Sequence, residues 1–302
     1  MPRQFKKIYI EISNVCNLQC DFCPVVERDK KIMTEELFAK VISESAPLTD
    51  EVCFHLMGEP LTHPKIGRYL DICAQHQLPV NITSNGILLD EEKNLLLLNP
   101  IVRQINFSLH SFKANFKDKD IRPYLNKIFN FTQTALQTRP DLYLNYRLWN
   151  LENENPENDF NEEIFQHIET FFNVSLNRRA HPDWKKSKNI LGRLYLHFDT
   201  RFDWPSLNAP LQGQKGFCHG LSSHIGIHAD GTLVPCCLDK EAGIKLGNCQ
   251  NSTIEEIIQT PRAQNIKNGF QKRQLNEDLC KRCTFIQRFD SKQSGSPTLL
   301  PD

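Results

Sequence analysis

The order of apolar patterns along the first half of the chain is the feature that most restricts its fold. From residue 7 onward, short apolar or alternating segments take turns with segments in which apolar residues recur at helical spacing. This pattern is typical of βα units built around a parallel sheet. The expected strands are residues 7–13, 51–57, 79–84, 103–110 and 142–149, and the expected helices are residues 33–45, 63–75, 90–98, 121–137 and 161–172.

Two segments compete for the sixth strand. Residues 174–178 are one candidate, while residues 193–199 alternate more strongly, with Leu194, Leu196 and Phe198 on one face. Five or six such units, without an evident seventh and eighth, predict an α/β fold with an incomplete (β/α)6 barrel that is open along one side. The functional residues of such a barrel are expected at the C-terminal ends of its strands.

The second part of the chain has a different character. After Pro205 and Pro210 the βα rhythm stops and cysteines become frequent, which predicts a barrel domain over 1–210 and a small domain over 211–288. Residues 224–236 are typical of a β-hairpin that turns at Asp230 and Gly231. A helix is expected at 253–267. The tail, 289–302, has almost nothing to bury and is expected to be disordered.

Charge and hydropathy exclude some classes of protein. The 36 Lys and Arg residues balance the 36 Asp and Glu residues, so no strong global field draws the chain to nucleic acid or anionic lipid. No apolar run approaches the roughly 18 residues that a membrane span needs. The basic start leads into a short alternating segment instead of a signal-peptide core, and we expect a cytoplasmic protein. Residues 150–158 and the basic residues 177–188 are expected to be surface loops, the latter in preference to a site for an anionic partner.

The chain has 11 cysteines, and in the cytosol such a count indicates metal or redox chemistry before disulfides. Cys16, Cys20 and Cys23 form a C-x3-C-x2-C group directly after the first expected strand. Three thiolates from one loop can hold an iron-sulfur cube while leaving one iron open to a ligand that is not protein. The alternatives are a zinc site that borrows Cys53 or a histidine, and three incidental thiols.

The segment Cys-Asn-Leu-Gln-Cys-Asp-Phe-Cys, residues 16–23, resembles the signature loop of the radical S-adenosylmethionine (SAM) enzymes. The resemblance implies that the open iron of a 4Fe-4S cluster is chelated by SAM, with Phe22 beside it. It also implies that the reduced cluster breaks SAM to give a 5′-deoxyadenosyl radical, and that a flavodoxin or ferredoxin-type protein delivers the electron.

Later segments of the chain also resemble segments of this family, and they follow in the same order along the sequence. Met57-Gly58-Glu59-Pro60 is similar to the Gly-Gly-Glu-Pro segment of the family, and implies that Gly58 and Glu59 receive the amino group of SAM. By the same resemblance Ser84 and Ser108, at the third and fourth strand ends, meet the ribose and carboxylate, Ser108 being the preferred residue of the two. Arg147 on the fifth strand is expected to pair with the cofactor carboxylate.

The second cysteine group is similar to the SPASM and twitch extensions of radical SAM enzymes, which bind auxiliary 4Fe-4S clusters. The expected ligands are Cys218, Cys236, Cys280 and Cys283, and because no cysteine follows Cys283 we expect one auxiliary cluster, the twitch arrangement. Four thiolates would equally close a zinc site.

The remaining cysteines are expected outside this ligand set. Cys237 follows Cys236 on the same expected strand, points to the other face and is expected to be packed. For Cys249, replacing one ligand and lying near the site as a thiol are both alternatives, and neither is the favoured expectation. Cys53 and Cys73 are expected to be small buried hydrophobes.

These features predict an oxidising radical SAM enzyme that acts on a peptide or a small metabolite, abstracting hydrogen and passing an electron to the auxiliary cluster. The first strand begins near residue 7, which leaves no room for a fused leader-peptide-binding domain and lowers the expectation of a peptide. His197, Asp199, Arg201, Asp203 and Trp204 would line a substrate pocket or form a solvated strand end. The alternatives are a non-catalytic zinc-binding or interaction protein on a barrel scaffold, and an RNA-modifying radical SAM enzyme.

Overall fold

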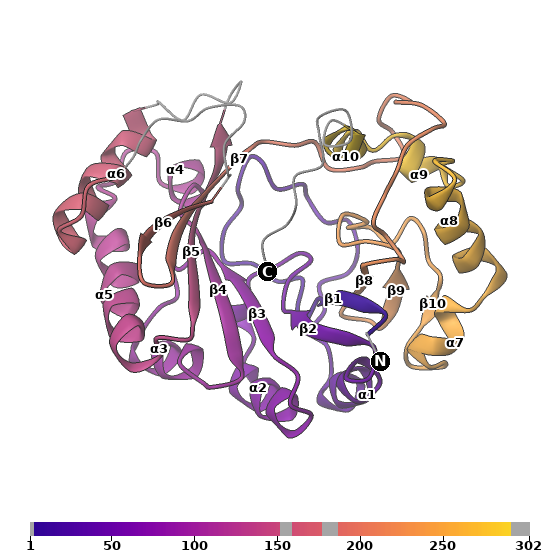
Figure 1. The fold of residues 1–302 in the computed structure, drawn as a ribbon, viewed down its shortest axis with the longest axis horizontal. Helices are drawn as coiled ribbons and strands as arrows, with labels where there is room; N and C mark the ends of the chain where they lie inside the picture. Colours follow the sequence, from indigo (N-terminus) through magenta and orange to yellow (C-terminus); the bar gives the residue numbers. More distant parts are fainter. Residues whose placement is uncertain (1–2, 152–158, 177–186, 291–302) are drawn as a thin grey trace.

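The computed structural model describes residues 3–151, 159–176 and 187–290 and contains one ten-stranded sheet in the order β10-β9-β8-β1-β2-β3-β4-β5-β7-β6. Figure 1 shows this sheet curving around the centre of the molecule with its helices outside. The strands are β1 (Phe5–Ile10), β2 (Thr49–Cys53), β3 (Val80–Ser84), β4 (Val102–Ser108), β5 (Tyr143–Leu151), β6 (Ser187–Leu191), β7 (Leu194–Thr200), β8 (His224–Ile227), β9 (Thr232–Val234) and β10 (Gly247–Asn248).

Six parallel strands, β1 to β5 and β7, form the barrel part of the sheet. The predicted incomplete α/β barrel is confirmed, and the sheet is not closed, because its edges are β6 and β10. The stronger candidate for the sixth strand is also confirmed as β7. Residues 174–176 form no strand, and 177–178 lie outside the described residues. The hairpin partner of β7 is β6, which pairs with it antiparallel and which the sequence pattern did not predict.

The helices follow the βα rhythm, with boundaries set by local contacts. The first helix begins two residues later than expected, because the Met33 N–H donates to Ile12 O instead of entering the helix, and the Thr34 hydroxyl caps the Leu37 N–H. The helices are α1 (Glu35–Ser45), η1 (Pro60–Thr62), α2 (Ile66–Gln75), α3 (Glu91–Leu97), α4 (Ser111–Asn115), α5 (Arg122–Thr138), α6 (Asp159–Phe172), α7 (Ile254–Ile258), α8 (Pro261–Gln271), α9 (Asp278–Lys281), η2 (Thr284–Ile286) and α10 (Gln287–Asp290).

The hydrophobic core lies between the sheet and the helices, while the inner face of the barrel is polar. Ile8, Phe107 and Tyr146 point outward and are fully buried, and each such burial contributes roughly 1.5–3 kcal/mol. On the inner face Asn106 donates to Asn81 Oδ1 at 2.8 Å, and Asn145 donates to Asn106 Oδ1 at 2.9 Å. This arrangement leaves the C-terminal end of the barrel able to hold a polar ligand.

The C-terminal part extends the barrel sheet. The predicted hairpin is confirmed as β8 and β9, with Gly231 at a φ of +84° in the turn, and β8 pairs parallel to β1. The expected boundary near residue 210 falls in the connection between β7 and β8. The single helix expected at 253–267 is wrong: Thr260 caps a new helix that begins at Pro261, giving α7 and α8.

Two further expectations need correction. Cys236 and Cys237 lie in a turn after β9 and not on a strand, so the inference that they face opposite ways does not hold. Phe289, expected in the disordered tail, lies in α10 with its ring 5.6 Å from that of Phe285. The loop expected at 150–158, the basic loop at 177–188 and the tail fall mostly or wholly outside the described residues. Within the described residues no helix is long and apolar enough to cross a membrane.

Candidate functional site

The first cysteine group lies in the loop between β1 and α1, at the C-terminal end of the barrel. The Cys23 N–H donates to Cys20 O at 3.1 Å, which curls the loop. Asn115, at the end of α4, donates from its side chain to Cys20 Sγ at 3.1 Å and accepts from the Gln19 N–H at 2.9 Å. The loop is therefore fastened to the fourth βα unit of the barrel.

The electrostatics of these thiols suit a cationic metal centre. Burial, together with the neighbouring thiols, raises the pKa of Cys20 to about 11 and that of Cys23 to about 11. Thiols bind metals as thiolates, so bound iron would relieve the cost of ionising them. In an iron-sulfur cube each thiolate binds a different iron atom. Among the described residues, no group of three His, Cys, Asp or Glu side chains is arranged to hold a single metal ion.

Gly58 brings the loop after β2 against the cysteine loop. Its φ is +81°, and a Cβ there would lie 2.3 Å from Ser13 O. The next residue, Glu59, donates its N–H to Val15 O at 2.9 Å. Only glycine permits this close approach, so the Met57-Gly58-Glu59-Pro60 segment is built onto the cysteine loop.

The Glu59 carboxylate is buried and already has hydrogen-bond donors. Its Oε1 accepts from the Leu61 N–H at 3.0 Å and its Oε2 from the Asn85 N–H at 2.7 Å. Burial raises the pKa of Glu59 to about 7, opposed by these backbone donors and by Ser84. This carboxyl group is thus close to half ionised at neutral pH and would be fully ionised beside an ammonium group.

The two serines expected at the cofactor have different surroundings. The Ser84 hydroxyl is buried and accepts from the Gly86 N–H at 3.0 Å, so it stabilises the turn that follows β3. Ser108 lines a cavity at the C-terminal ends of the strands. Ser108 therefore faces the cavity, whereas the Ser84 hydroxyl accepts from a backbone N–H inside the protein.

Arg147 on β5 enters the same cavity. Its Nη1 donates to Thr83 Oγ1 at 3.3 Å, and its guanidinium carbon lies 4.6 Å from the ring centre of Trp149. Its Nε is buried and has no hydrogen-bond partner among the described residues. Burial lowers the pKa of Arg147 to about 10, so it remains a cation with donor capacity to spare. These properties fit a carboxylate ligand.

The four expected auxiliary ligands come together. Cys218, Cys236, Cys280 and Cys283 line one cavity, and burial is the main cause that raises the pKa of each of them. Four thiols that line one cavity are the donor set that a closed cluster requires. Cys237 lines the cavity as well, beside the Tyr9 hydroxyl, which corrects the expectation that it is simply packed.

The other three cysteines do not line the cavity, although Cys53 has Cys237 and Arg147 among its electrostatic neighbours. Cys249 is completely buried in the hydrophobic core, with Glu44 and Lys40 as its charged neighbours, so it neither replaces a ligand nor lies near the site. Cys73 and Cys53 are buried as expected.

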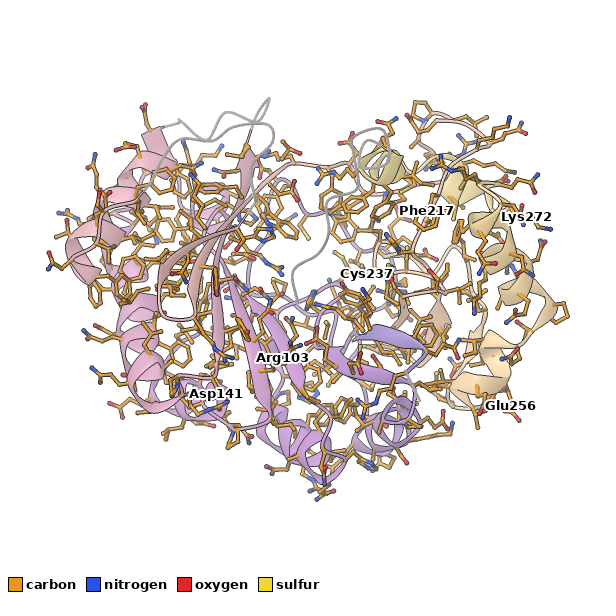
Figure 2. The ribbon with its side chains drawn as sticks, in the orientation of Figure 1. Arg103, Asp141, Phe217, Cys237, Glu256 and Lys272 are labelled. Atoms are coloured by element: carbon orange, nitrogen blue, oxygen red, sulfur yellow. The ribbon has the colours of Figure 1, made fainter. Side chains whose placement is uncertain are left out.

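One cavity of about 390 Å³ connects the two cysteine groups, because Cys23 and the auxiliary cysteines line it together. Figure 2 places Cys237 at the centre of the molecule, beside the open interior of the sheet. Aromatic side chains, among them Phe22, Trp149 and Trp204, form part of the walls. Sequence reasoning missed several of the lining residues, namely Tyr9, His55, Trp149, Phe202, His224 and Phe285.

Two neutral imidazoles flank Tyr9 on the cavity wall. The rings of His55 and His224 meet the Tyr9 ring edge to face, at 5.3 and 5.8 Å between centres. Burial lowers the pKa of His55 to about 3 and that of His224 to about 4. These side chains therefore offer uncharged hydrogen-bonding groups to a ligand.

The residues expected near the sixth strand divide between two environments. Arg201 and Trp204 line the cavity. Asp199 forms an ion pair with Arg288 at 2.8 Å, and the His197 ring meets the Trp149 ring at 5.8 Å. Asp203 accepts through its backbone carbonyl from Thr284, at 3.5 Å. Only part of that cluster therefore faces the cavity.

Comparison with known proteins matches both halves of the chain to family models. The radical SAM superfamily model matches residues 10–158, and the SPASM iron-sulfur cluster-binding domain model matches residues 218–284. A GTP 3′,8-cyclase from Synechocystis sp. is 28% identical over 291 residues, which is 85% of this chain and 86% of that protein. A tungsten-containing aldehyde ferredoxin oxidoreductase cofactor-modifying protein from Pyrococcus furiosus is 31% identical over 91 residues, 29% of this chain and only 26% of that protein.

Solved structures share the fold at low sequence identity. BtrN in complex with AdoMet and 2-DOIA has a TM-score of 0.59 at 16% identity, with 94% of each chain covered. Native anSMEcpe with bound AdoMet and the Cp18Cys peptide has a TM-score of 0.58 at 15% identity, covering 92% of this chain and 86% of that chain. The chain therefore belongs to the radical SAM superfamily and carries a SPASM-type domain, and its cofactors are SAM and 4Fe-4S clusters.

Proposed function

We propose that this radical SAM enzyme oxidises a peptide or small metabolite bound in the cavity between its two cysteine groups. The bound cofactors supply the reactive chemistry: reductive cleavage of SAM to a 5′-deoxyadenosyl radical, hydrogen abstraction from the substrate, and an acceptor for the remaining electron. A flavodoxin or ferredoxin-type protein would deliver the first electron in the cytoplasm.

The observation that carries this proposal is the shared cavity. Cys23 lines it from the barrel, and Cys218, Cys236, Cys280 and Cys283 line it from the C-terminal part. A substrate in this cavity would lie between the site of hydrogen abstraction and the acceptor. Four thiolates leave no vacant iron, which favours electron acceptance or a structural role over direct binding of the substrate to the auxiliary cluster.

The residues of the chain would bind SAM and exclude water. Arg147 and Ser108 would hold the carboxylate and ribose of SAM, and Gly58 and Glu59 its amino group, with Phe22 beside the first cluster. Phe22 and Trp204 belong to the aromatic wall, which would keep bulk water from a radical intermediate. Tyr9 and the neutral His55 and His224 would bind polar groups of the substrate.

The substrate class stays open between a peptide and a small metabolite. Proteins of similar fold have been solved with either kind of ligand, BtrN with 2-DOIA and anSMEcpe with the Cp18Cys peptide. The GTP 3′,8-cyclase relative would suggest a nucleotide. The charged residues of the cavity wall are Arg147, Arg201 and Asp239, and about half of the other lining residues are aromatic or aliphatic, which favours a ligand with less charge than a nucleoside triphosphate.

Metal analysis of anaerobically reconstituted protein tests the two-cluster proposal. We expect about eight irons per chain in the wild type and about four in a Cys280→Ala/Cys283→Ala variant, with production of 5′-deoxyadenosine retained. Cys249→Ala is the matched control, because Cys249 is buried in the core away from both groups, and it should keep about eight. Equal iron in the double variant and the wild type would remove the auxiliary cluster from the account. Zinc at the auxiliary site would instead favour a structural role for the C-terminal part.

A further inference from the structure

A buried ion pair joins the two cysteine-bearing segments away from the cavity. Glu11, fully buried directly after β1, accepts two hydrogen bonds from the guanidinium of Arg28, at 3.1 and 2.9 Å. It also accepts from the Ala229 N–H at 3.2 Å, and His228 Nδ1 lies 3.5 Å from it. The ion pair therefore links the end of the cysteine loop to the turn between β8 and β9.

Arg28 also reaches the segment that follows the auxiliary cysteines. Its Nε donates to Lys240 O at 2.7 Å, and Glu241 accepts from the Glu27 and Arg28 N–H groups at 3.1 and 3.2 Å. His228 Nε2 lies at hydrogen-bond distance, 2.9 Å, from Asp239 O. Residues 239–241 begin three positions after Cys236, and Arg28 lies five positions after Cys23.

The two segments that this contact joins, residues 29–31 and residues 239–244, differ in how far their other hydrogen bonds depend on Arg28. Residues 29–31, in the part of the cysteine loop that leads to α1, have hydrogen bonds that do not involve Arg28. Asn14 donates to Asp29 O at 2.8 Å and accepts from the Lys31 N–H at 2.7 Å.

Residues 239–244 are held by the Asp239 carboxylate, which accepts from the Gly243 and Ile244 N–H groups at 2.7 and 2.8 Å, and by the burial of Ile244. Across to the cysteine loop, Lys240 Nζ also donates to Val25 O at 3.2 Å. The Asn14 contacts do not involve Arg28, whereas Lys240 and Glu241 both bond to it, so loss of Arg28 should affect residues 240–241 more than residues 29–31.

From this geometry we propose that Arg28 and Glu11 are positioning residues that hold the auxiliary-cluster segment at a fixed place relative to the SAM-cluster loop, and so set the spacing of the two clusters. The inference rests on the two-cluster function proposed above. Neither residue lines the cavity, so they act through the segments that they join. A bidentate pair between a fully buried carboxylate and a mostly buried guanidinium is well suited to fix such a distance.

Hydrogen exchange of the cluster-loaded holoenzyme tests the direction of the effect. In Arg28→Gln we expect amide exchange in a peptide covering 238–246 to rise at least tenfold, while exchange in 29–34 stays within twofold of the wild type. Glu241→Ala removes two of the contacts without leaving a buried charge, and it should give the same pattern with a smaller rise. Arg68→Gln is the control, because Arg68 forms an exposed pair with Glu35 that shares no residue with this contact.

Pulsed dipolar spectroscopy of the two reduced clusters gives the second readout. A narrow distribution of distances in the wild type that broadens in Arg28→Gln supports the proposal. An unchanged distribution, or exchange that rises equally in both peptides, overturns it. A wild type with a single cluster would count against the proposed function, and the exchange pattern would then decide alone whether Arg28 holds residues 238–246.

Discussion

The side-chain amide of Asn115 donates a hydrogen bond to Cys20 Sγ at 3.1 Å, although the two residues are 95 positions apart. Hydrogen bonds to the sulfurs help to set the reduction potential of an iron-sulfur cluster. If this bond favours the reduced state by about 1 kcal/mol, Asn115→Ala should shift the potential of the first cluster by roughly 40 mV toward more negative values. A redox titration followed by EPR measures the shift.

The control for this substitution is Asn130→Ala, at an exposed position of α5. It should leave the potential of the cluster unchanged. Equal potentials in the Asn115 variant and the wild type would show that the hydrogen bond does not tune the cluster.

Gly58→Ala should damage the first cluster site. The new Cβ would meet Ser13 O at 2.3 Å in a backbone conformation with φ at +81°, so the cysteine loop or the end of the second βα unit must move. We expect a loss of at least about 2 kcal/mol in the free energy of unfolding and a lower iron content at the first site. Gly243→Ala is matched to it, since its Cβ would make ordinary contacts at 3.5 Å, and it should have little effect. Normal iron in the Gly58 variant would contradict the close packing.

Ser108→Ala and Ser84→Ala should have different consequences. Ser108 lines the cavity, so its removal should weaken SAM binding about fivefold to tenfold, near 1 kcal/mol, with little change in stability. Ser84 caps the Gly86 N–H inside the protein and helps to lower the pKa of Glu59, so its removal should cost about 1 kcal/mol of stability and should weaken SAM binding less than Ser108→Ala does. Equilibrium binding and thermal unfolding separate the two, and the reverse pattern would exchange their roles.

SAM affinity should depend on pH through Glu59. Burial raises the pKa of Glu59 to about 7, and only its ionised form can pair with an ammonium group. Below pH 7 the affinity should therefore fall by up to about tenfold per pH unit, and above pH 7 it should level off. Dissociation constants at pH 6, 7 and 8 measure this slope. Glu59→Gln should bind SAM more weakly and with little dependence on pH, whereas an unchanged slope in that variant would assign the titration to another group.

Features that arise from contiguous residues could be predicted from the sequence. The Thr34 cap, the βα order and the C-x3-C-x2-C loop each depend on neighbours within a few positions. Proline explains two of the errors. Pro261 can start a helix but cannot continue one, which splits α7 from α8, and Pro235 has no N–H to extend the β9 ladder, so Cys236 and Cys237 fall in a turn.

The rest of the site depends on residues that meet only in three dimensions. Tyr9, His55 and His224 come from three different strands or strand ends, and none of them has a spacing or a motif that marks it. The ion pair between Glu11 and Arg28 likewise cannot be predicted from the charge pattern, because the pattern does not show that Glu11 is buried. A single sequence therefore indicates the ligands of the clusters but not the walls of the cavity between them.

The central claim is that Cys16, Cys20 and Cys23 hold a cluster whose open iron binds SAM and allows its reductive cleavage. The most direct measurement is the formation of 5′-deoxyadenosine by anaerobically reconstituted protein after addition of SAM and dithionite. The account predicts that this product forms in the wild type and is absent when Cys16, Cys20 and Cys23 are replaced with alanine. A wild-type protein that carries the reduced cluster, binds SAM and yet forms no 5′-deoxyadenosine would contradict it.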